Sequence, residues 1–216
     1  MIRLCGKDVF RNRLFFLILL IFNMGYVAIH FLPKGQFNSL CIEFQELYIM
    51  VIAVLIPSFM NQRYSDVNRN IVQETIGAKV RNLDLFQICY QVLIIHAILA
   101  VTLVTLVILS FLPNFSLFQE ILFACHIYII SILFVLLFIG LVNIINRFIL
   151  GSVIYLVSVF VLVLINAPYS YLWLKYSMEY DLTDGTHWIG KGLFLFLFFI
   201  IYSMSFSIKR VRERGK

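Results

Sequence analysis

Side chains that could do chemistry are few in this 216-residue chain, and their spacing argues against several kinds of site. The histidines fall on different predicted spans or loops without metal-ligand spacing: His30, His96, His126 and His187. No paired intramembrane carboxylates and no Ser/His/Asp set are visible. The run GTHWIGKG at 185–192 matches a phosphate-loop spacing up to Lys191, but a glycine stands where Ser or Thr should bind magnesium. We therefore expect that the chain is not an enzyme, has no catalytic residue or metal site, and binds no cofactor itself.

One polar stretch, RNIVQETIGAKVRNLDLF at residues 69–86, separates two long apolar segments and carries charges of both signs. Val72, Ile76, Val80 and Leu83 recur at helical intervals, which predicts an apolar stripe along one face of a helix. Charged and polar residues occupy its other faces: Arg69, Gln73, Lys79 and Arg81. This pattern predicts an amphipathic helix over 69–83. Such a helix either lies on lipid headgroups or docks on a soluble partner.

The composition indicates what kind of protein must position this helix. Hydrophobic residues make up 62% of the chain and charged residues 13%, with 22 Phe, which is typical of an integral membrane protein. A span needs about 20 mostly apolar residues. Six stretches qualify as transmembrane helices, approximately 14–32, 44–60, 86–112, 121–143, 148–166 and 189–208. We expect an all-α polytopic membrane protein, with 1–216 forming a single transmembrane domain.

The orientation follows from the lysines and arginines. Of the 17 such residues, only Lys34, Lys175 and Lys191 fall on the outer side if the N-terminus is cytoplasmic. This positive-inside bias predicts that both termini are cytoplasmic, that 61–85 is a cytoplasmic loop, and that 167–188 is external. The net charge of +6 then reflects topology and contact with anionic membrane lipids, and it is no argument for nucleic acid binding.

Asp, Glu, Lys and Arg are expected to be absent from the middle of the membrane, and His96, about a third of the way along its span, is expected as a hydrogen-bonded packing residue. Glu46 and Glu120 are predicted at the outer ends of spans. This distribution disfavours a channel or secondary carrier, because such proteins need ionisable groups near the bilayer centre. Four asparagines are expected to hydrogen bond across helices: Asn23, Asn143, Asn146 and Asn166.

These features together resemble the membrane subunits of ATP-binding-cassette (ABC) transporters, in the six-span "type two" exporter class. The basic start, MIRLCGKDVFRNR, looks like the amphipathic interfacial helix before the first span of such permeases. The segment NRNIVQETIGAKVRN is similar to their cytoplasmic coupling helix, with Glu74, Gly77 and Arg81 in the acidic, small and basic places. The loop after the fourth span is minimal, and 167–188 is long enough for their external re-entrant hairpin.

The resemblance implies a permease subunit in a bacterial cell membrane, powered by a separate ABC ATPase subunit that binds ATP. It also implies a second permease subunit, which would make a homodimer or a pair with a paralogue. The short loop after the first span looks like that of compact permeases for peptide, bacteriocin or drug export, and the aromatic spans favour an amphipathic or lipid-like cargo. The expected ATPase-coupling residues are Val72, Glu74, Ile76, Gly77, Val80 and Arg81. The alternative is a non-transport membrane scaffold or sensor whose loop binds another cytoplasmic partner.

Overall fold

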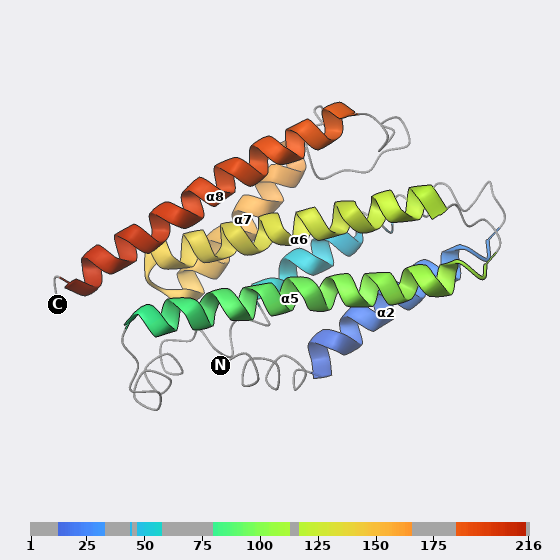
Figure 1. The fold of residues 1–216 in the computed structure, drawn as a ribbon, viewed down its shortest axis with the longest axis horizontal. Helices are drawn as coiled ribbons and strands as arrows, with labels where there is room; N and C mark the ends of the chain where they lie inside the picture. The colour runs from blue at the N-terminus through green and yellow to red at the C-terminus, as the bar shows by residue number, and fades with distance from the viewer. Residues whose placement is uncertain are drawn as a thin grey trace.

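A computed structural model of the chain is helical throughout the parts it describes, which are residues 13–32, 44, 47–57, 80–112, 117–165 and 185–214 (Figure 1). The all-α prediction is confirmed for these residues. A short helix, Leu47–Pro57, carries no label in the figure. The labelled helices are α2 (Arg13–Ile29), α5 (Val80–Leu109), α6 (Leu117–Ile145), α7 (Phe148–Ile165) and α8 (Gly185–Arg214).

Each of the six predicted spans contains one of these helices. Three stretches are long and apolar enough to cross a bilayer: Gln91–Leu109 in α5, Glu120–Ile145 in α6 and Trp188–Lys209 in α8. The apolar parts of the other helices are shorter, at Arg13–Ile29, Leu47–Pro57 and Phe148–Leu162. Large apolar side chains such as Phe111 and Ile149 are 84% and 79% exposed on the surface. An apolar helical exterior of this kind fits a membrane protein.

Helix α6 is the centre of the bundle, because it packs against α5, α7 and α8, while α2 packs against α5. Glycines allow two of these close approaches. A Cβ atom added to Gly151 in α7 would lie 2.9 Å from the Cα atom of Val142 in α6, and one added to Gly140 would lie 3.1 Å from the Ile201 side chain in α8. Small residues at helix contacts let backbones approach closely, which is how helices associate in lipid.

The ends of α6 and α8 are joined at the side of the bundle where α5 begins. Asn146 ends α6 with a left-handed φ of 59°, and its backbone N–H donates to the Val142 carbonyl at 2.9 Å. Asn146 is exposed in this turn, so the prediction that it bonds across helices is wrong. Arg212 of α8 donates to the Ile144 carbonyl at 2.6 Å, which satisfies one of the carbonyls left open at the end of α6.

Helices α5 and α8 extend furthest beyond the predicted spans. Helix α5 already begins at Val80, within the predicted loop 61–85, and α8 continues through the basic tail to Arg214. The charged ends of these helices are expected in water, where hydropathy gives no signal for them. The predicted N-terminal amphipathic helix, most of the predicted coupling segment and nearly all of the external segment 167–188 lie outside the described residues.

Candidate functional site

Helix α2 carries a row of polar side chains along one face. Asn23 and Tyr26 are three residues apart, and His30 follows four residues later, just after the helix ends. Residues at these spacings share one side of a helix. All three are buried, and His30 is fully enclosed. Buried polar groups need hydrogen-bond partners, so this row marks the side of α2 that meets other polar groups.

Asn23 joins three helices. Its Nδ2 donates to the Leu19 carbonyl at 2.7 Å and to the Tyr48 hydroxyl at 2.9 Å, and its Oδ1 accepts from the Thr105 hydroxyl at 2.8 Å. Tyr48 belongs to the helix Leu47–Pro57 and Thr105 to α5. The prediction that Asn23 bonds across helices is therefore confirmed.

Asn143 also bonds across helices, as predicted. Its Nδ2 donates to the Ser205 hydroxyl of α8 at 3.4 Å, a long hydrogen bond. Both asparagines thus connect neighbouring helices, and Asn166 lies outside the described residues.

Glu120, in the first turn of α6, meets the end of α2. Its Oε1 lies 2.9 Å from His30 Nε2, and its two oxygens lie 3.4 and 3.2 Å from the donating Tyr26 hydroxyl. His30 Nδ1 lies 3.0 Å from the Tyr26 backbone carbonyl. Glu120 is only 7% exposed, so its predicted place at a span end is correct but it does not face open water. We call His30, Tyr26 and Glu120 the α2–α6 clasp.

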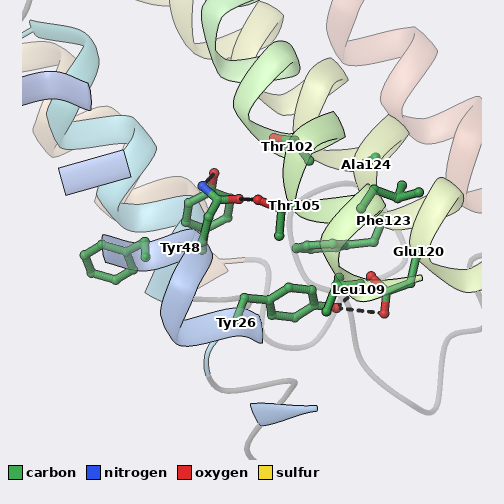
Figure 2. A pocket seen from close by; sticks show the side chains of 11 residues that line it. Tyr26, Tyr48, Thr102, Thr105, Leu109, Glu120, Phe123 and Ala124 are labelled. Carbon is green, nitrogen blue, oxygen red and sulfur yellow. Dashed lines mark hydrogen bonds between the residues drawn. The ribbon is translucent and has the colours of Figure 1, made fainter. Parts of the chain in front are cut away.

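A small cavity lies between the clasp and Asn23. Figure 2 shows Tyr26 directed toward Glu120, with Phe123 beside it and Thr105 above. The volume open to the centre of a water molecule is about 10 Å³, which is about the minimum for one ordered water. The lining residues come from α2, the helix Leu47–Pro57, α5 and α6: Phe22, Asn23, Tyr26, Tyr48, Thr102, Thr105, Leu106, Leu109, Glu120, Phe123 and Ala124.

The cavity is lined mainly by apolar surface, with a few polar groups among the lining side chains. The Tyr26 and Phe123 rings pack with their centroids 5.1 Å apart. Toward the end of the bundle where α2 begins, the next buried side chains along the helices are apolar, namely Leu19, Ile52 and Ile98. The polar groups that line the cavity therefore lie in the half of the bundle where α2 ends and α6 begins.

The predicted coupling residues do not form part of this cavity as far as the structure describes them. Val72, Glu74, Ile76 and Gly77 lie outside the described residues. Val80 and Arg81 form the first turn of α5, where the backbone is helical. The connection between the predicted coupling segment and the cavity is thus α5 itself.

The clasp was missed in the sequence analysis. The spacing of Asn23, Tyr26 and His30 is a local signal for a polar helix face, and it could have been noticed. The partner of His30 is 90 positions away in the sequence, so nothing local indicates it. Lys191, which is predicted on the outer side, is only 1% exposed. Its Nζ lies 5.2 Å from the centroid of the Trp188 ring.

His96 lies on the exposed side of α5, and its Nδ1 is 2.6 Å from the Val92 carbonyl one turn earlier. The expectation of a hydrogen-bonded His96 is confirmed. Its side chain does not pack in the interior, however, and this differs from the expected packing role.

Metal binding has no support in this part of the chain: the described residues contain no group of three or more His, Cys, Asp or Glu side chains arranged to hold an ion. Comparison with known proteins found no matching family model, no matching curated protein and no matching solved structure.

Proposed function

We propose that this chain is the membrane-spanning permease subunit of an ABC transporter, which exports an amphipathic substrate with energy from a separate ATPase subunit. The observation that carries the proposal is the continuity of α5. It is one helix from Val80, inside the predicted coupling segment, to Leu109, which lines the cavity.

A continuous helix transmits force along its axis. With 30 residues, α5 is about 45 Å long at 1.5 Å per residue. Near one end, Val80 and Arg81 directly follow the segment that would contact the ATPase. Near the other end, Thr105 bonds Asn23 of α2 and stands beside Glu120 of α6 in the cavity wall. Displacement of the coupling segment would therefore move the cavity wall relative to α2 and α6.

The proposal includes six crossings, with both termini in the cytoplasm of a bacterial cell. The three long apolar helices and the three shorter ones support six crossings, and the uneven distribution of Lys and Arg supports the orientation. In this orientation Arg13 and Val80 lie at the cytoplasmic side, and the α2–α6 clasp lies toward the outside. A short helix can cross a bilayer if the bilayer thins around it or if flanking residues continue the span.

Two permease subunits would pair to match two ATPases, as a homodimer or with a paralogue. His96 supports a second subunit on α5, because an imidazole that faces lipid within a span is costly unless another protein covers it. The exposed apolar and aromatic surface supports an amphipathic or lipid-like cargo over a hydrophilic one.

The coupling contact can be tested by reversing the charges of the predicted coupling segment. We expect Glu74→Lys combined with Arg81→Glu to abolish copurification of a chain that has a Walker-type phosphate-binding motif, while membrane insertion stays normal. The matched control is Arg147→Glu combined with Glu213→Lys. It has the same net charge change and the same predicted membrane side, but it lies outside the 61–85 loop, and it should retain the ATPase.

Several results would overturn the proposal. These are copurification that is unchanged by the Glu74/Arg81 reversal, external labelling of a cysteine at position 75, or uphill solute movement in liposomes by the purified chain alone.

The alternative, a membrane scaffold or sensor, is favoured by the small size of the cavity, which has room for about one water. A scaffold would also bind a cytoplasmic partner through 69–83, but that partner would have no nucleotide site. Identifying the copurified chain by mass spectrometry therefore separates the two functions.

A further inference from the structure

The hydrogen bonds of His30 fix the number of protons in the α2–α6 clasp. A backbone carbonyl can only accept a hydrogen bond, so the 3.0 Å contact between His30 Nδ1 and the Tyr26 carbonyl requires a proton on Nδ1. The imidazole therefore has its first proton in a fixed position. Its other nitrogen, Nε2, points at Glu120.

The 2.9 Å contact between His30 Nε2 and Glu120 Oε1 needs a second proton. Either Nε2 carries it and donates to a carboxylate, or Glu120 carries it and donates to a neutral imidazole. Both forms contain one proton more than a neutral histidine beside an ionised glutamate. The proton belongs to the pair rather than to either residue.

We propose that His30 and Glu120 form a binding site for one proton, and that loss of this proton separates the end of α2 from the start of α6. Without this proton, the one hydrogen left on the imidazole can lie in only one of the two contacts, either between Nδ1 and the Tyr26 carbonyl or between Nε2 and Glu120. The other contact then places two acceptors within 3.0 Å of each other, at His30, which is fully buried. Two buried acceptors that face each other repel and lack a donor.

Among the residues that the structure describes around the clasp, few other side chains carry a charge. Within the clasp, the Tyr26 hydroxyl of α2 donates to Glu120. Tyr48 lines the cavity from the helix Leu47–Pro57. The α5 residues that line the cavity are uncharged, and Glu120 is the one ionised type among all the lining side chains described. His126 of α6 lies behind Phe123, with ring centroids 6.5 Å apart. Within the described part of the chain, His30 and Glu120 are therefore the titratable pair at the centre of the clasp.

The site is reachable by protons through Glu120. The side chain of Glu120 is 9% exposed, whereas that of His30 is 0% exposed. Because α6 begins at Leu117, the carboxyl group lies within the first turn of the helix. The proton thus enters from the end of the bundle where α2 ends, which is the external side in the proposed topology.

The dependence on pH follows from counting protons in the separated and closed states. Separated residues have ordinary pKa values of about 4.3 for Glu and about 6.5 for His, so together they hold one extra proton between these values. The closed clasp holds one as well. Closure is therefore insensitive to pH in that window. Above about pH 6.5 the separated state has lost the proton, so the equilibrium constant for closing the clasp falls by up to tenfold per pH unit.

Replacement of Glu120 by Gln reverses this dependence. The Gln amide donates to a neutral His30 Nε2 and its carbonyl accepts from Tyr26, so both contacts survive without the extra proton. In Glu120→Gln, the equilibrium constant for closing the clasp does not depend on pH above about pH 6.5. Below this pH it falls, because the separated His30 gains a proton. Wild type and variant respond in opposite directions.

The test uses the full chain in lipid nanodiscs, with its four cysteines replaced by alanine. Spin labels at Phe31→Cys and Phe118→Cys, two exposed positions beside the clasp, report the α2–α6 distance by pulsed electron paramagnetic resonance. We expect the ratio of short to long distances to fall by about 10- to 100-fold between about pH 6.5 and 8.5 in wild type, and to stay constant in Glu120→Gln. His126→Asn should behave as wild type.

The inference is overturned if the wild-type distance is the same across this range, if Glu120→Gln falls as wild type does, or if His126→Asn removes the response. The wild-type measurement needs no substitution in the clasp. No ATPase is present in the sample, so the result is independent of the proposed transport function.

Discussion

The polar connections of Asn23 allow a quantitative test of what holds α2, α5 and the helix Leu47–Pro57 together. Asn23→Leu removes two cross-helix hydrogen bonds, to Tyr48 and Thr105. Hydrogen bonds between membrane helices contribute about 0.6 kcal/mol on average and at most about 1.7. The expected loss in free energy of unfolding is therefore about 1.2 kcal/mol for Asn23→Leu, and about 0.6 for Thr105→Val.

The double variant is the sharper measurement. The Asn23 to Thr105 bond can be lost only once, so Asn23→Leu with Thr105→Val should cost about 0.6 kcal/mol less than the sum of the single variants. Reversible unfolding in mixed micelles, followed by the fluorescence of the two tryptophans, supplies all three values. Ser158→Ala is the control, because Ser158 is partly exposed and its hydroxyl donates within its own helix, to the Ile154 carbonyl at 2.8 Å. Additive costs, or an Asn23→Leu cost no larger than that of Ser158→Ala, would refute the reasoning.

Three further predictions concern packing within the bundle and pairing with a second subunit. Gly151→Ala should lower the free energy of unfolding by about 1–3 kcal/mol because its Cβ meets Val142, whereas Gly192→Ala, with open space around it, should be neutral or stabilising in the same unfolding assay. Asn146→Val should cost about 1–2 kcal/mol because of the left-handed backbone, and thermal unfolding should show that Asn146→Gly is tolerated. His96→Leu should leave the stability of the single chain unchanged but lower the dimer fraction in cross-linking of native membranes, and an unchanged fraction would place the second subunit elsewhere.

The helical architecture could be predicted because membranes restrict the choice of structure. Long apolar runs have only helices or closed barrels available to them, and every predicted span does contain a helix. Helix ends were predicted less well. Val80 and Arg214 lie in polar sequence, where helix continues beyond the apolar stretch and hydropathy is silent.

The candidate site could be predicted only in part, for a different physical reason. Asn23 was recognised because an amide in an apolar span must find a partner, whatever that partner is. Glu120 lies at the start of α6, as predicted for a span end, but its partners His30 and Tyr26 are 90 and 94 positions away in the sequence. From a single sequence one can infer that a buried carboxylate needs a partner, but not which residue that partner is. For Asn146, a cross-helix hydrogen bond was predicted, but this residue instead forms the turn after α6 with a left-handed backbone.

The central position of α6 has a consequence for biogenesis. Helix α8 follows α6 and α7 in the chain, so the face of α6 that packs against α8 stays uncovered until the ribosome has completed α8, which ends at Arg214. A nascent chain released soon after Ile145 would present Gly140 and the amide of Asn143 to lipid or to the insertion machinery. Truncated products of this kind would lack the contacts of α8, including the hydrogen bond from Arg212 to the Ile144 carbonyl at the end of α6.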